Sequence, residues 1–177
     1  MARIALFFAC LALAIILSAE SHAQGKLSDV RILASAASIN EILGSNIVEG
    51  PSSVKGTYSE RKSADGAESA ILQYVDFHDN KTAEMMLKMN LDGNKADLAQ
   101  NKIITGIYET IAEFPKGGAN ASVMTGSGVN SAWKNLVRMQ FALGSYLITF
   151  DTRGIPVGQV TPKLPAIFSL IKKNSGM

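Results

Sequence analysis

The stretch WKNLVRMQFALGSYLITFD, residues 133–151, decides the fold class. Apolar side chains at every second position of residues 137–141 and 146–150 give the period of two that is typical of β-strands. Between the two runs, Gly144 and Ser145 suit a two-residue type II′ turn, in which the glycine takes a positive φ. The stretch therefore predicts an antiparallel β-hairpin.

The rest of the chain supplies partners for this hairpin. Apolar or alternating runs bounded by turn residues predict further strands at residues 54–61, 68–77, 106–114 and 121–125. Apolar residues at helical spacing predict helices at residues 27–44, 79–91 and 161–173. Residues 95–105 fit either a short helix or a loop.

Residues with clear end preferences flank these helices. Gly44 is expected to end the first helix, although Ser38, three residues before a glutamate, has capping-box spacing and would begin it later. Residues 92–94, Asp-Gly-Asn, are expected to end the second. Thr161 is the predicted N-cap of the last helix, with Pro162 in its first turn.

Single apolar stripes on the helices and short turns between the strands define the architecture. Such helices must bury one face, and short connections favour antiparallel neighbours. We therefore predict an α+β fold, in which two or three helices pack on an antiparallel sheet of five or six strands.

The first 23 residues have the three parts of a secretory signal. Arg3 gives a positive start, residues 4–17 are an uncharged apolar run, and Ser21 and Ala23 form a small-residue cleavage site. The apolar run is shorter than the roughly 20 residues of a membrane span, with an uncleaved anchor as the alternative. We predict a signal peptide at 1–23, a single domain at 24–177, and a periplasmic or extracellular location.

Composition excludes several classes of function for the domain. Cys10, the chain's one cysteine, belongs to the predicted signal, so no disulfide is expected. The formal net charge is +2 and the charges are scattered, which argues against nucleic-acid binding. We expect no cofactor and no membrane span after cleavage, and the oligomeric state stays open.

His78 is the one histidine of the predicted mature chain. A surface or capping role is expected for it, because the chain has no Gly-Xaa-Ser-Xaa-Gly elbow and a zinc site needs several His or Cys ligands. Met85 and Met89 follow at i,i+4, and thioethers bind Cu(I), so a copper or haem site with His78 is a weak alternative. Methionines at this spacing are more often filling of a core.

Paired carboxylates give a second alternative, a small secreted hydrolase. Glu109 with Glu113, or Asp76 with Asp79, could serve glycoside chemistry if a cleft held them. A solvated face explains these pairs equally well.

The segment 115–132 is the strongest candidate for contacts with a ligand or partner. It is long and rich in Gly and Asn, and such loops are often functional. Lys116, Asn120 and Asn130 within it, and Trp133 after it, are the predicted contact residues. The leading hypothesis is an exported, non-enzymatic binding or interaction module, for a small ligand or a protein partner; the hydrolase and the metal or haem accessory protein are alternatives.

Overall fold

The structure is a computed structural model of the whole chain. It describes residues 27, 29–51, 56–100, 104–108, 119–124 and 135–177. The predicted signal peptide lies outside these residues.

Six antiparallel strands form one sheet, in the order β1-β2-β6-β5-β4-β3. Their bounds are β1 Tyr58–Lys62, β2 Ser69–Asp76, β3 Ile104–Tyr108, β4 Ala119–Met124, β5 Leu136–Leu143 and β6 Tyr146–Arg153. The predicted hairpin is confirmed, because Leu143 pairs with Tyr146 and Gly144 has a φ of 57°. The hairpin lies at the centre of the sheet.

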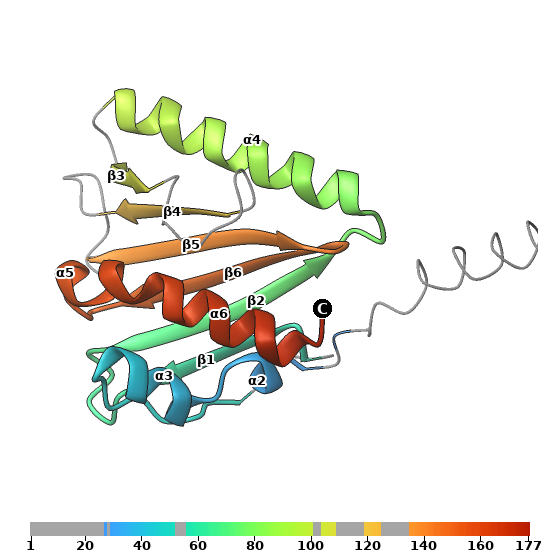
Figure 1. Cartoon of the computed structure of the whole chain (residues 1–177). Helices are drawn as coiled ribbons and strands as arrows, with labels where there is room; N and C mark the ends of the chain where they lie inside the picture. The colour runs from blue at the N-terminus through green and yellow to red at the C-terminus, as the bar shows by residue number, and fades with distance from the viewer. Residues whose placement is uncertain (1–26, 28, 52–55, 101–103, 109–118, 125–134) are drawn as a thin grey trace, which may run out of the picture.

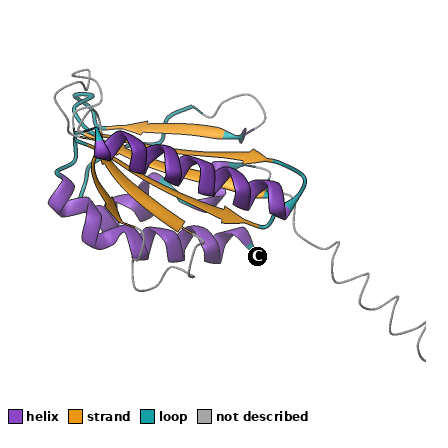
Figure 2. Cartoon of the chain, turned by 90° about the horizontal axis from the view of Figure 1, so that it is seen from above, coloured by secondary structure: helices purple, strands orange, loops and turns teal. Residues whose placement is uncertain are grey.

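Helices cover both faces of this sheet (Figure 1). They are α2 Val30–Leu33, α3 Ala36–Leu43, α4 Asn80–Ala99, α5 Val157–Val160 and α6 Leu164–Ser175, with a 3-10 turn at Thr161–Lys163. Seen from above, the strands lie between α4 on one side and the other helices on the opposite side (Figure 2). The predicted α+β class, strand number and antiparallel pairing are confirmed.

The face under α2, α3 and α6, here the apolar face, holds the main core. Every second residue of the central strands points into it, including Leu72, Met139, Phe141 and Phe150, all fully buried. The predicted stripe of α6 is buried here too, and its Phe168 meets Phe141 edge to face at 4.9 Å. Among the described residues, most of the buried apolar side chains therefore lie on one side of the sheet.

The opposite face, here the polar face, is covered by α4 alone among the described helices. Ala83 and Leu87 bury the inner side of α4 over β3, β4, β5 and β6. The strand β2 carries apolar side chains on both of its faces. Ile71 is buried on the polar face, but Val75 is 51% exposed, because α4 does not extend over this part of β2.

The predicted helix at 27–44 is divided in two. Ser35 interrupts it in extended conformation, and its hydroxyl accepts a hydrogen bond from the Ser38 N–H as the N-cap of α3. The alternative start at Ser38 is therefore wrong. The expected stop at Gly44 is confirmed, with a φ of 70° that favours glycine.

Helix α4 is longer than its sequence predicted. Asp79 is its N-cap, as expected, but the helix continues through residues 92–94 to Ala99. Gly93 costs a helix only about 1 kcal/mol, and the following Lys, Ala and Leu residues favour helix. The predicted end at 92–94 is therefore wrong, and the segment after 94 is helical up to Ala99.

The last helix begins differently from the prediction. Thr161 forms no side-chain cap; it opens the 3-10 turn that separates α5 from α6. Pro162 and Pro165 each lack an N–H, which breaks the regular i to i−4 ladder and divides residues 157–175 into three pieces. Lys172 and Lys173 lie in the last turn of α6, where positive charge favours a helix C-terminus.

A short segment after α3 closes the free edge of β1. Val48 pairs with Lys62 in an isolated antiparallel bridge, with its N–H bonded to the Lys62 carbonyl at 3.0 Å. Gly50 passes so close to the Glu60 carbonyl that a Cβ would collide with that backbone oxygen. This packing fixes residues 45–50 beside the start of the β1–β2 turn.

Candidate ligand-binding site

Three of the four predicted contact residues, Lys116, Asn130 and Trp133, lie outside the described residues. The fourth, Asn120, is in β4, directly opposite Gln140 of β5 in the strand register. The hypothesis of a contact site around 115–132 therefore stays a prediction.

His78 lies at the junction of β2 and α4, in a strained conformation with a φ of 59°. Its side chain is 85% exposed, and its Nδ1 lies 3.0 Å from an Asp76 carboxylate oxygen. Asp76 also accepts hydrogen bonds from the His78 N–H and the Ser145 hydroxyl, both at 2.8 Å. The two bonds keep the pKa of Asp76 below its usual value, against the effect of burial, which alone would raise it.

This cluster does not have the geometry of a Ser-His-Asp relay. In such a relay the serine hydroxyl donates to the histidine, which takes its proton. Here the Ser145 hydroxyl donates to Asp76, and Asp76 lies between the other two groups. The arrangement orders the junction, in line with the expected surface or capping role of His78.

The other predicted carboxylates are also engaged or not described. Asp79 accepts hydrogen bonds from the Thr82 N–H and hydroxyl at the start of α4, which lower its pKa. Glu109 and Glu113 lie outside the described residues. Asp76 and Asp79 therefore both accept hydrogen bonds that order the junction between β2 and α4.

The two methionines face solvent. Met85 is 54% and Met89 58% exposed, because both lie on the side of α4 turned away from the sheet. The expectation that they fill the core is therefore wrong; Ala83 and Leu87 do so instead. In the described part of the chain, no group of three His, Cys, Asp or Glu residues is placed to hold a metal ion.

Four polar side chains of β5 and β6 on the polar face are paired with each other. Arg138 of β5 donates two hydrogen bonds, of 2.8 and 2.7 Å, to the carboxylate of Asp151 in β6. Beside them, Gln140 donates to the Thr149 hydroxyl at 3.3 Å. These four side chains of β5 and β6 therefore satisfy one another.

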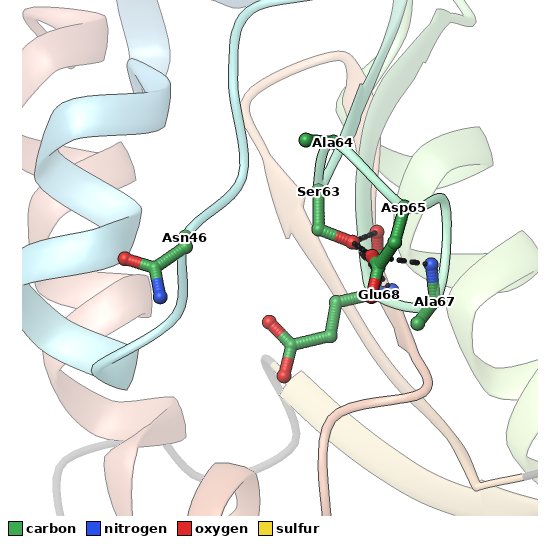
Figure 3. Close-up of a pocket in the computed structure, with 6 residues that line it drawn as sticks. All are labelled: Asn46, Ser63, Ala64, Asp65, Ala67 and Glu68. Atoms are coloured by element: carbon green, nitrogen blue, oxygen red, sulfur yellow. Dashed lines mark hydrogen bonds between the residues drawn. The ribbon is translucent and has the colours of Figure 1, made fainter.

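An open pocket lies between the segment after α3 and the β1–β2 turn (Figure 3). Its volume is about 440 Å³, within the range of small-molecule sites. Six residues line it: Asn46, Ser63, Ala64, Asp65, Ala67 and Glu68. The lining combines small side chains with a few polar groups.

Asp65 is fixed by the turn on which it sits. Its carboxylate accepts hydrogen bonds from the Ser63 hydroxyl at 2.6 Å and from the Ala67 N–H at 3.0 Å. These two bonds lower the pKa of Asp65. The turn therefore holds one permanent negative charge at the pocket at neutral pH.

Glu68 and Asn46 line opposite sides of the pocket, and their polar ends are unused. Glu68 extends from the turn toward Asn46 on the opposite wall (Figure 3). Among the described residues, neither the Glu68 carboxylate nor the Asn46 amide has a hydrogen-bond or ion-pair partner. The pocket thus offers carboxylate and amide oxygens to a group that donates hydrogen bonds.

Sequence reasoning did not single out these residues. A turn is expected between the strands predicted at 54–61 and 68–77, and a Ser-Xaa-Asp-Gly sequence indicates side-chain bonds within a turn. Asn46, by contrast, is 22 residues away from Glu68 along the chain. Only the path of residues 45–50 along β1 brings it to the turn.

The fold and site define a class, an α+β domain with helices on both faces of an antiparallel sheet and a small acceptor-rich pocket at one sheet end. A solved structure of this architecture is the extracellular domain of PknH from Mycobacterium tuberculosis, with a TM-score of 0.57. The similarity covers 86% of this chain and 98% of that one, at 9% sequence identity, and so shows a shared fold. No family model and no curated protein matches the chain.

No helix in the part of the chain that the structure describes has the length and hydropathy to cross a membrane.

Proposed function

We propose that this chain is exported by its N-terminal signal and acts outside the cytoplasm as a non-enzymatic binding module. The fold it shares with an extracellular domain supports this location. The secretory pattern of residues 1–23 supports it independently.

The pocket of Figure 3 is the proposed binding site. The observation that carries the proposal is a pair of groups without partners among the described residues, the Glu68 carboxylate and the Asn46 amide, on residues that line the two sides of an open cavity. Asp65 adds a second negative charge. This arrangement fits a positively charged hydrogen-bond donor, an amine or guanidinium, on a small ligand or on a basic side chain of a partner.

Titration of the mature protein, residues 24–177, with arginine amide, spermidine and an Arg-rich peptide tests this. Glu68→Gln removes the unpartnered charge and keeps the shape, so affinity should fall by about tenfold, as for loss of one charge-assisted hydrogen bond. Glu84→Gln, on the exposed side of α4, makes the same change in net charge elsewhere and should bind like the wild type.

The same titration also distinguishes a small cationic ligand from a basic side chain of a protein partner. Tighter binding of the peptide than of the small amines favours a protein partner, and the reverse favours a small ligand. Equal losses in Glu68→Gln and Glu84→Gln would show a general charge effect and overturn the assignment of the pocket.

A further inference from the structure

The C-terminal end of α3 is held by side chains from the far end of the chain. The last carbonyls of a helix have no partner within the helix. Here Gln159 of α5 donates its amide to the Leu43 carbonyl at 2.6 Å, and Lys163 donates to the Ile42 carbonyl at 2.6 Å. Residues more than a hundred positions away thus fix the end of an eight-residue helix.

The same helix holds the wall of the pocket. The Asn40 side chain accepts from the Ile47 N–H at 3.0 Å and donates to the Ile47 carbonyl at 2.7 Å. Its oxygen also accepts from the Ser45 hydroxyl at 2.9 Å. These bonds bracket Asn46, so the position of its amide depends on the position of Asn40.

We infer that Gln159 and Lys163 are positioning residues for the pocket, acting on Asn46 through α3 and Asn40. The contacts are continuous from α5 to the end of α3 and from Asn40 to the wall. If the carbonyls of Ile42 and Leu43 lose their donors, the last turn of α3 frays, and residues 45–47 move with it. This inference rests on the proposed function for its consequence in binding, but not for the link itself.

Hydrogen exchange tests the link without any ligand. In mature Gln159→Met/Lys163→Met protein, the Gly44 and Ile47 amides should exchange about three- to tenfold faster, as expected for losing one or two hydrogen bonds. Exchange of the β5 amide of Met139 is the internal reference for global stability. Lys173→Met, an exposed lysine in the last turn of α6, is the matched control and should leave all three amides unchanged.

A second readout connects the link to the pocket. The double variant should bind arginine amide several-fold more weakly, and Asn40→Ala should weaken it as well. If the Gly44 and Ile47 amides of the double variant exchange at the wild-type rate relative to Met139, the inference is overturned, regardless of the binding results. If wild-type protein binds no probe but these amides still exchange faster in the double variant, the proposed function fails while the positioning role stands.

Discussion

The two faces of the sheet differ in what they contribute. The apolar face is packed by α2, α3 and α6 around fully buried Leu, Ile, Met and Phe side chains. The polar face has one helix above it among the described helices and keeps Asp151, Gln140 and Thr149 among its buried groups, with Arg138 partly exposed beside them. Among the described residues, the larger cluster of buried apolar side chains lies on the apolar face, so we expect this face to supply more of the stability than the polar face.

The largest effect expected from this comparison is the loss of a core aromatic. Phe141→Ala removes a fully buried ring and its contact with Phe168, and should lower the free energy of unfolding by about 3–5 kcal/mol. Thr149→Ala on the polar face should cost only about 1 kcal/mol. Urea denaturation of both variants measures the difference; similar costs would mean that the two faces share the stability equally.

The next effect concerns Arg61, a buried cation on the apolar side of the sheet. Arg61 is fully buried beneath the junction of α2 and α3, donates to the Ala34 carbonyl, and has its Nε 3.2 Å from the Glu49 carboxylate. Burial lowers the pKa of Arg61, so the cation depends on its counter-ion.

Glu49→Gln should therefore cost about 2–3 kcal/mol in urea denaturation, less than for a wholly buried pair because Glu49 is 40% exposed. Glu60→Gln, which breaks the exposed pair with Lys62, should cost less than about 1 kcal/mol. A harmless Glu49→Gln would show that Arg61 needs no counter-ion at this site.

A smaller effect is expected from the charged pair of the polar face. Asp151→Leu leaves the Arg138 guanidinium without its partner and should cost about 1–2 kcal/mol, because Arg138 can still reach water. Arg138→Met/Asp151→Leu removes both charges and should restore most of that loss. If the double variant were less stable than the single one, the pair would contribute net stability, and the contrast between the faces would weaken.

The smallest effect concerns acid stability at the β2–α4 junction. The pKa of Asp76 is lower in the folded state than the unfolded value of about 3.9, so its contribution is complete above that value and is lost as the pH falls through the folded pKa. Asp76→Asn should therefore lose stability at pH 7 and show a flatter decline below about pH 4 than the wild type. Thermal melts between pH 2.5 and 7 measure this, and an identical acid decline in both proteins would contradict it.

The parts of the fold that depend on local periodicity and turn residues could be predicted from the sequence. The hairpin 136–153 and the buried stripe of α6 follow from local periodicity and turn chemistry, and both are confirmed. Helix α4 ran past its predicted end because one glycine is a weak breaker when good helix formers follow. Thr161 failed as a cap because two nearby prolines divide the helix.

The site could not be predicted, because it is made by tertiary contacts. Asn46 lines the same pocket as Glu68 because Val48 bridges to Lys62, and the exposure of Met85 and Met89 depends on which side of α4 packs on the sheet. A sequence shows that these methionines share a helix face but not whether that face is covered. The pairing of distant segments, rather than local secondary-structure propensity, decides the position of Asn46 and the exposure of the two methionines.

The most direct test of the account is to map where a cationic probe binds. Amide chemical shifts of ¹⁵N-labelled mature protein would be followed by NMR during titration with arginine amide. The account predicts saturable shifts confined to Asn46 and residues 63–68, with smaller ones at the end of α3, and their loss in Glu68→Gln. Shifts centred on the polar face or on α4, or the same shifts in Glu68→Gln, would contradict it.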